Sequence, residues 1–296
     1  MQAQRARLPG GRWHFSHGPI DLILLAEGQP DAVAQAHTQA WERFGSVLPE
    51  LVSELPELRK LVGAGTAVQG PVARRMWRAC APLSAYGLTA MAAVAGAVSD
   101  EIICCYQRPG IVRAWVNNGG DIALHLTPGS STRIGLCSDP RRLPGAAPAI
   151  LDGGVRIGDD APVRGVATSG WRGRSFSLGI ADSVTVLARD AAAADAAATV
   201  IANAVDTGNR AIVRRPANAL KDDTDLGDRL VTVDVPPLPH AVVAEALEAG
   251  VARAGELERQ GLIFGAALVC QGQARVAGSR LGPARPQSLE GGSVFA

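Results

Sequence analysis

The sequence has few aromatic residues and no surplus of charge of either sign. Five Trp, two Tyr and five Phe make up 4% of the 296 residues, and 29 basic side chains stand against 28 acidic ones. Nucleic-acid-binding proteins commonly carry a basic stripe or an aromatic surface on which bases stack. We therefore expect no nucleic-acid partner.

The sequence also lacks an apolar run long enough to cross a membrane. Its longest runs, near residues 88–98 and 262–270, are about half as long as a spanning helix. The N-terminal stretch has basic residues but no apolar segment after them, which argues against a secretory signal. The five cysteines form no C-x-x-C pair, which favours reduced thiols. We expect a cytoplasmic protein with no membrane partner.

What the sequence does have is a large apolar fraction in short segments. Hydrophobic residues make up 47% and charged residues 19% of the chain, as is typical of a folded globular protein. We expect a single domain over residues 1–282 and a loose C-terminal tail over 283–296. Strand-length segments with close turn signals alternate with helical patterns. The predicted fold class is α+β, with antiparallel sheets and packed helices.

Turn signals and hydrophobic spacing place these elements along the chain. Strands are predicted over 20–25, 102–106, 111–116, 121–126, 132–137, 154–158, 163–167 and 230–235, and a final hairpin over 262–269 and 272–277. Helices are predicted over 31–44, 84–99, 189–205 and 239–259, with further helical segments around 47–60 and 72–80 that Pro49, Pro56 and the loop over 63–71 interrupt. The spacing between residues 102 and 137 is too short for helical crossovers, so we expect an antiparallel meander there.

The helix predicted over 189–205 carries an acid among alanines. Asp195 and Thr199 are four residues apart and share one face of that helix. Their oxygens can reach one point, as the ligands of a hard cation do. An Asp among alanines is also costly to bury without a partner. The alternative is an exposed acid on a solvated helix face.

A second cluster, Asn117–Ile122, lies between two segments of strand character. Its two glycines, Gly119 and Gly120, are typical of a hairpin turn. Alternatively, backbone without side chains lets a ligand phosphate approach the amide groups. Asp121 would then hold a ribose hydroxyl or an adjacent metal ion.

Together the two clusters resemble the ApbE-like family, which includes the flavin transferases. The resemblance rests on the N-x-G-G-D-I turn at Asn117–Ile122, the A-T-S-G turn at Ala167–Gly170, the S-V-T-V strand at Ser183–Val186 and the A-D-A-x-A-T helix at Ala194–Thr199. Met91–Val98 is similar to the corresponding helix of a short branch of that family whose function is uncharacterised. The resemblance implies an ApbE-like fold with an internal duplication.

The family's transferases bind FAD and Mg²⁺, split the pyrophosphate, and attach FMN through a phosphoester to a Thr or Ser of an acceptor protein. By position, the resemblance implies that Asp195 and Thr199 bind the metal. It implies a flavin nucleotide site made of two segments, Asn118, Gly119, Gly120 and Asp121 in the first and Thr168, Ser169 and Gly170 in the second. Asp121 and Asp182 are both candidates for the base that accepts the proton of the acceptor hydroxyl.

The segment before the S-V-T-V strand departs from the transferases. They carry a His-Ile-x-Asp-Pro-x-Thr-Gly type segment there, whereas residues 171–182 of this chain contain no His, Pro or Thr. Arg172 and Arg174 in this segment are candidates to contact a phosphate or carboxylate, because the guanidinium fork suits both. The alternative is a pair of solvated hairpin charges.

Two functions from different classes therefore stay open. The first is a Mg²⁺-dependent enzyme that acts on a flavin nucleotide, as an FMN transferase or an FAD pyrophosphatase. The second is a non-catalytic flavin- or pterin-binding protein in a cofactor pathway, for example one of methanopterin-type one-carbon cofactors. The oligomeric state also stays open, a homo-oligomer included.

Overall fold

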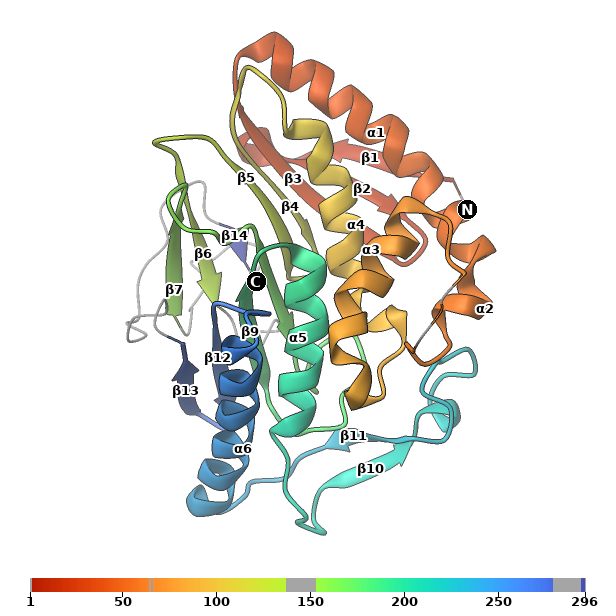
Figure 1. Cartoon of the computed structure of the whole chain (residues 1–296), viewed down its shortest axis with the longest axis vertical. Coiled ribbons are helices and arrows are strands. Elements are labelled where there is room, and N and C mark those ends of the chain that lie inside the picture. Colours follow the sequence, from red (N-terminus) through yellow and green to blue (C-terminus); the bar gives the residue numbers. More distant parts are fainter. Residues whose placement is uncertain (1, 64, 66, 137–152, 279–293, 296) are drawn as a thin grey trace.

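The computed structural model describes residues 2–63, 65, 67–136, 153–278 and 294–295. Its centre is a nine-stranded antiparallel sheet in the order β1-β2-β3-β4-β5-β8-β9-β12-β13 (Figure 1). These strands are β1 (Gln4–Arg7), β2 (Trp13–His17), β3 (Ile20–Gly28), β4 (Ile111–Asn118), β5 (Asp121–Leu126), β8 (Gly165–Ser169), β9 (Ser183–Ala188), β12 (Gly265–Cys270) and β13 (Gln273–Ala277).

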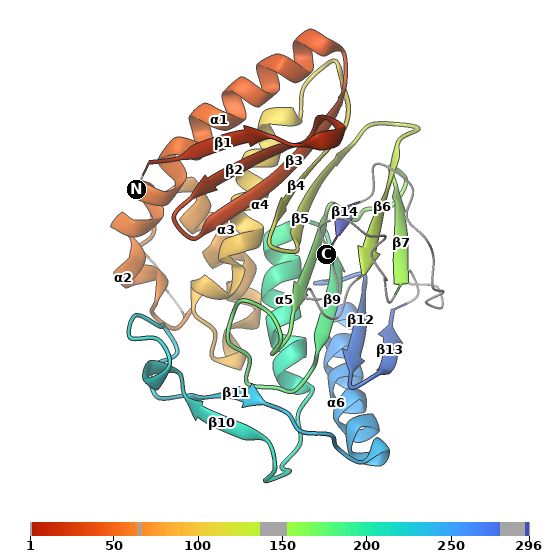
Figure 2. The ribbon, with the colours of Figure 1, turned by 180° about the vertical axis from the view of Figure 1, so that it is seen from behind.

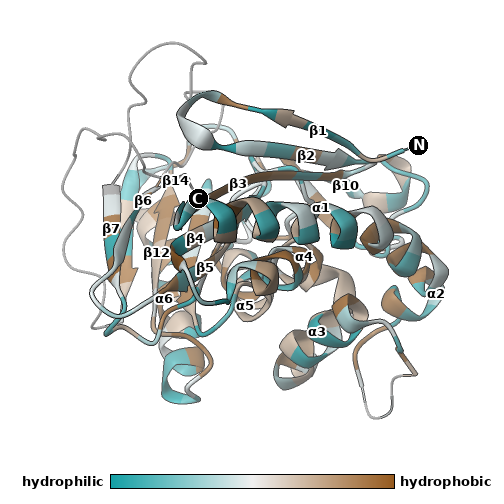
Figure 3. Cartoon of the chain, turned by 90° about the horizontal axis from the view of Figure 1, so that it is seen from above, coloured by the Kyte–Doolittle hydropathy of each residue, from teal (hydrophilic) through white to brown (hydrophobic). Residues whose placement is uncertain are grey.

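The helices pack on one face of this sheet (Figure 3). They are α1 (Pro30–Ser53), α2 (Leu55–Leu58), α3 (Pro71–Cys80), α4 (Val94–Ile103), α5 (Ala191–Ala204) and α6 (His240–Arg259). Short 3₁₀ turns lie at Pro9–Gly11, Ala81–Tyr86, Ala90–Ala93, Cys104–Tyr106 and Ala217–Ala219. Within the ranges given above, no helix combines the length and apolar character needed to cross a membrane.

Two smaller β-structures lie beside the main sheet (Figure 2). β6 (Ser131–Leu136), β7 (Gly153–Gly158) and β14 (Val294–Phe295) form a three-stranded sheet, and β10 (Val213–Pro216) pairs with β11 (Leu230–Asp234). Ile134 of β6 and Ile157 of β7 share a hydrophobic cluster with Ile122 and Val166 of the main sheet. The three-stranded sheet therefore covers the face that the helices leave open.

The order of elements in the main sheet is repeated. In the first half, the hairpin β2–β3 leads into α1, and α4 leads into the hairpin β4–β5. In the second half, β8–β9 leads into α5, and α6 leads into β12–β13. The halves meet where β5 pairs with β8. The α+β prediction is confirmed, and the topology shows the duplication that the resemblance implied.

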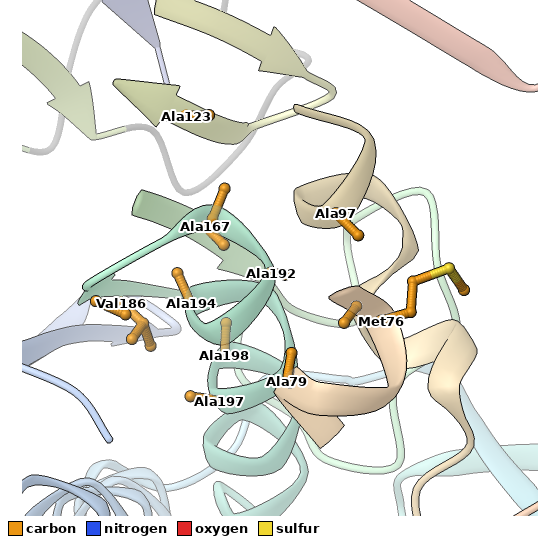
Figure 4. Packing of buried hydrophobic residues seen from close by; sticks show 14 of the residues in the cluster. Met76, Ala79, Ala97, Ala123, Ala167, Val186, Ala192, Ala194, Ala197 and Ala198 are labelled. Carbon is orange, nitrogen blue, oxygen red and sulfur yellow. The ribbon is translucent and has the colours of Figure 1, made fainter. Parts of the chain in front are cut away.

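The larger hydrophobic cluster fills the space between the sheet and the helices (Figure 4). Ala123, Ala167 and Val186 face it from the strands, and Ala194 and Ala198 face it from α5. Small side chains let the backbones of neighbouring elements come close together in a well-packed interior. A polar side chain on the inner face of α5 therefore lies in a place with little water.

Three predicted regions differ from the structure. The helix predicted over 84–99 is replaced by two 3₁₀ turns and by α4, which begins only at Val94. Residues 102–106 form the end of α4 and a 3₁₀ turn, so the strand predicted there was wrong; periodicity does not separate short apolar runs of strand and helix. Of the predicted meander, β4 and β5 form an antiparallel pair, whereas β6 pairs with β7 in another sheet. Helix α1 continues past residue 44, through Pro49, because its buried stripe extends to Val47 and Leu51. Apart from residues 294–295, the predicted tail over 283–296 lies outside the described residues.

Candidate functional site

Strand register brings the two predicted nucleotide-binding turns together. Ile122 of β5 pairs with Val166 of β8, so the turn before β5 lies beside the end of β8. The Thr168 N–H donates to Oδ1 of Asp121 at 3.2 Å. Two segments that are far apart in the sequence thus meet at one end of the sheet, where the two halves of the molecule join.

The Asn118–Asp121 turn is a two-residue hairpin turn. Asn118 pairs with Asp121 across the hairpin, and Gly119 and Gly120 have φ of 67° and 113°, a region that favours glycine. The Gly120 N–H donates to Oδ1 of Asn117 at 2.8 Å. The glycines thus serve the turn itself, and the amide of Gly120 is already engaged.

The side chain of Asn118 ties this turn to the helices. Its Nδ2 donates to the carbonyl oxygen of Ala95, at the start of α4, at 3.2 Å. Asn118 is buried, so this contact is shielded from water. The turn is therefore held at a set distance from the first turn of α4.

Asp195 faces the first turn of α4. The Gly96 N–H donates to its Oδ2 at 3.0 Å, which is where a helix N-terminus favours negative charge. Burial raises the pKa of Asp195 to about 7, although the amides of Gly96 and Ala95 act in the opposite direction. Thr199 follows one helical turn later and is partly buried. The exposed-acid alternative for Asp195 does not hold in this structure.

Asp121 and Asp195 form a pair of neighbouring carboxylates. Asp121 is buried, and its pKa is raised well above the ordinary value, first by burial and then by the negative charge of Asp195. Two desolvated carboxylates near each other take up a proton or a cation. In the part of the chain that the structure describes, no group of three or more His, Cys, Asp or Glu side chains is placed to hold a metal ion. Further ligands at this pair would be hydroxyl or backbone oxygens, water, or a bound phosphate.

Thr168 reaches the site through its backbone only. Its neighbours on β8, Val166 and Ala167, lie in the clusters on opposite faces of the sheet, and side chains alternate along a strand. Oγ1 of Thr168 lies 2.8 Å from Oγ1 of Thr185, on the face away from Asp195. The hydroxyl of Thr168, a residue that the resemblance assigns to the nucleotide site, therefore points away from the carboxylate pair.

The other two residues of this turn have different surroundings. Ser169 is partly buried at the end of β8. Gly170 is buried, and a Cβ at this position would lie 2.4 Å from the carbonyl oxygen of Asp182. Close packing of two chain segments thus accounts for Gly170.

The segment over 171–182 is held in place by hydrogen bonds to Asp182 and by a cation–π contact. Arg172 Nε donates to Oδ1 of Asp182 at 2.6 Å, and the guanidinium lies 4.6 Å from the ring centroid of Trp171. Asp182 also accepts from Trp171 Nε1 at 3.2 Å and from the Gln271 N–H at 2.5 Å. Three donors already occupy the two oxygens of Asp182, so the geometry favours Asp121 over Asp182 as the candidate base.

Arg174 is the exposed cation nearest to the hairpin turn in this segment. Its side chain extends over the turn, because a Cβ at Gly119 would lie 3.6 Å from Arg174 Nη1. Arg174 and Gly119 are both exposed to solvent. Arg174 can therefore meet an anion at this end of the sheet, whereas Arg172 has one of its donors committed to Asp182.

Two buried polar residues of α4 were missed by sequence reasoning. The Ser99 hydroxyl donates to the carbonyl oxygen of Asp121 at 2.8 Å. Asp100 accepts from the amides of Ala191 and Ala192 at 3.0 and 2.8 Å. The available signal was the pair Ser-Asp at the end of an otherwise apolar run of alanine, valine and glycine.

Most of the chain matches a known protein family. A family model described as AbpE bacteria matches residues 5–276, which include every element of the main sheet except the first residue of β1 and the last of β13. The chain belongs to this family. The ApbE-like resemblance drawn from the four motifs is thereby confirmed.

Individual relatives of this AbpE-family chain match it over about two thirds of its length. A UPF0280 protein of Methanopyrus kandleri is 34% identical over 190 residues, which are 62% of this chain and 69% of the relative. A UPF0280 protein of Methanosphaerula palustris is 32% identical over 199 residues, which are 67% of this chain and 78% of the relative.

Solved structures match more loosely. A mutant of the flavin transferase ApbE from Vibrio cholerae is 14% identical, with a TM-score of 0.49 over 93% of this chain and 97% of that one. The apbe protein of Thermotoga maritima is 13% identical, with a TM-score of 0.44 over the same shares of the two chains.

Proposed function

We propose that this protein binds a flavin nucleotide, FAD or FMN, together with Mg²⁺ where its two halves join. The observation that carries the proposal is the pair of desolvated carboxylates, Asp121 and Asp195, at this junction in a member of the AbpE family. A cation between them would offset both their repulsion and their desolvation.

The donors at this junction suit a hard cation. Asp121 and Asp195 supply carboxylate oxygens, and Thr199 supplies a hydroxyl on the same face of α5 as Asp195. Oδ1 of Asp121 accepts the Thr168 N–H and Oδ2 of Asp195 accepts the Gly96 N–H, and the Ala95 amide also acts on Asp195. An ionised carboxylate has about four lone-pair sites, so both side chains can still bind a cation. When bound, Mg²⁺ would neutralise charge on the phosphates of the nucleotide.

Basic side chains at the same end of the sheet would contact the anionic part of the ligand. Arg174 lies over Gly119 and is exposed, so it is free to meet a phosphate. Arg172 donates from Nε to Asp182, and its two Nη groups can donate to a ligand. Asn118, Gly120, Ser169 and Gly170 shape the turns around this position, and Thr168 contributes its amide.

For FMN transfer, Asp121 is the base that the geometry favours. The oxygen of an acceptor hydroxyl would bond to the phosphorus of the FMN half of FAD, and the bond to the AMP oxygen would break. Asp121 would take the proton of the hydroxyl, because its carboxylate lies at this junction and burial disfavours its charged form. With water in place of the hydroxyl, the products are free FMN and AMP, as in an FAD pyrophosphatase.

A second candidate is binding of a flavin or a pterin without transfer. The hydrogen bonds of Trp171 and Arg172 to Asp182 favour this second function. They lie in the segment where the transferases carry their His-containing segment. A rate enhancement requires groups that are placed for the transition state. A protein that keeps the cation end and has a different segment at 171–182 can bind the cofactor without transferring it.

Calorimetric titration with FAD, in the presence and absence of Mg²⁺, tests binding. We expect heat and a thermal shift that need both Mg²⁺ and Asp195, and hence neither in Asp195→Asn. Asp222→Asn, at an exposed position, is the control for the change of charge. Absence of heat and of any thermal shift in the wild-type protein would refute the proposal.

The products distinguish the candidates. After incubation with FAD, Mg²⁺ and a Thr-containing acceptor protein, covalent flavin on the acceptor indicates transfer. Free FMN and AMP indicate a pyrophosphatase. Intact FAD that remains bound indicates the non-catalytic function.

A further inference from the structure

Helix α4 holds both carboxylates of the candidate cation site through two adjacent residues. The Ser99 hydroxyl donates to the backbone carbonyl of Asp121 at 2.8 Å. Next to it, Asp100 accepts the first two amides of α5, the helix that carries Asp195, at 3.0 and 2.8 Å. Ser99 and Asp100 are both buried, with exposed fractions of 0% and 6%.

The contact between α4 and α5 is reciprocal. Asp100 of α4 binds the first turn of α5, and Asp195 of α5 binds the first turn of α4 through Gly96. A Cβ at Gly96 would lie 2.2 Å from the carbonyl oxygen of Ala191, so the two backbones touch there. Neither helix can slide along the other without breaking two sets of charge-assisted hydrogen bonds.

Strand β8 confines the start of α5 from the other side. A Cβ at Gly165 would lie 2.0 Å from the carbonyl oxygen of Asp190. Asp190 is the N-cap of α5 and accepts the Ala193 N–H at 2.8 Å. Asp190 therefore caps the same helix as Asp100 but makes no link between α5 and α4 in these hydrogen bonds.

We propose that Ser99 and Asp100 are positioning residues that set the distance between Asp121 and Asp195 and thereby the affinity of the site for a divalent cation. The inference rests on the proposed function, because it concerns the same carboxylate pair. Ser99 fixes the strand that carries one ligand, and Asp100 fixes the helix that carries the other. Outer residues that orient metal ligands commonly change metal affinity about 10- to 100-fold when they are replaced.

The test measures Mn²⁺ affinity by electron paramagnetic resonance and thermal stability in parallel, on the full chain. In Ser99→Ala and Asp100→Asn we expect Mn²⁺ affinity to fall at least about 10-fold. Asp190→Ala is the matched control, since it removes a cap of α5 but not the link to α4. It should lower the melting temperature and leave Mn²⁺ affinity within about threefold. Ser99→Ala changes no charge, so its effect separates positioning from simple electrostatic attraction.

The outcomes are distinct. If Ser99→Ala and Asp100→Asn lose no more affinity than Asp190→Ala at a similar loss of stability, the two residues are merely structural and the inference is wrong. If the wild-type protein itself binds no Mn²⁺, the proposed function fails first and the inference falls with it. Asp100→Asn keeps the shape and one acceptor oxygen, and Ser99→Ala is a small change, so a folded protein is expected in both cases.

Discussion

Replacing Asp195 by asparagine should stabilise the cation-free protein while abolishing its response to Mg²⁺. Asparagine has nearly the same shape as aspartate and keeps an oxygen that can accept the Gly96 N–H. It carries no charge to desolvate. The substitution thus removes the cost of the buried carboxylate and, at the same time, a ligand of the candidate cation site.

The magnitude follows from the pKa of Asp195, which burial raises from 3.8 to about 7. This rise means that ionising Asp195 costs about 4 kcal/mol more in the native protein than in the unfolded chain. Because the native pKa lies above the unfolded one, the cost is absent below about pH 3.8, grows between about pH 3.8 and about pH 7, and is constant above that. We therefore expect Asp195→Asn to raise the free energy of unfolding by up to about 4 kcal/mol at pH 8, and by less than half of that at pH 5.

Urea unfolding at pH 5 and pH 8, with and without Mg²⁺, measures both effects. Wild-type protein should gain stability from Mg²⁺ at pH 8, where Asp195 is ionised, and the variant should gain none. Asp222→Asn should leave unfolding within about 0.5 kcal/mol of wild type at either pH, as is usual for an exposed substitution. The reasoning is refuted if Asp195→Asn is less stable than wild type at pH 8, if its gain is the same at both pH values, or if it retains the Mg²⁺ response.

Three further substitutions test other parts of the structure by denaturant unfolding and cation titration. Gly96→Ala should destabilise by at least about 2 kcal/mol, because its Cβ would lie 2.2 Å from a backbone oxygen of α5; Gly63→Ala, with open space around it, should not, and equal losses would contradict the close helix contact. Thr168→Val should cost about 1–2 kcal/mol through its lost 2.8 Å hydroxyl contact and leave Mg²⁺ binding unchanged; weaker binding would show that the hydroxyl does reach the site. Arg172→Ala should cost about 2–4 kcal/mol, because it leaves the carboxylate of Asp182, only 9% exposed, without its ion-pair partner; a neutral result would show that the two remaining donors suffice.

Local sequence patterns were informative where one short segment decides the structure. The Asn-Gly-Gly-Asp turn is a hairpin turn because only glycine adopts positive φ freely at both central positions. The i, i+4 spacing put Asp195 and Thr199 on one face of a helix, and the alanines around them predicted burial. The alternation of strand-length and helix-length segments was sufficient for the α+β class.

Where short-range patterns are degenerate, the prediction failed. The apolar run at residues 102–106 reads equally well as a strand or as the end of a buried helix, and packing against α1 and α3 decides for the helix. In the same way, the prediction divided helix α1 into a helix over 31–44 and a segment from residue 47 that Pro49 interrupts. The buried stripe that includes Leu51 continues past Pro49, and burial outweighs the local cost of the proline.

The sequence by itself determined the family, the turn chemistry and the residue types of the candidate site, because these depend on neighbours along the chain. Only the tertiary structure decided which side chains face one another. The pairing of β5 with β8 brought Asp121 to the amide of Thr168, and side-chain alternation turned the hydroxyl of Thr168 to the other face. The crossing of α4 and α5 placed Asp100 on one helix start and Asp195 on the other. Register and helix crossing result from burial summed over the whole core, so no local pattern in the chain encodes them.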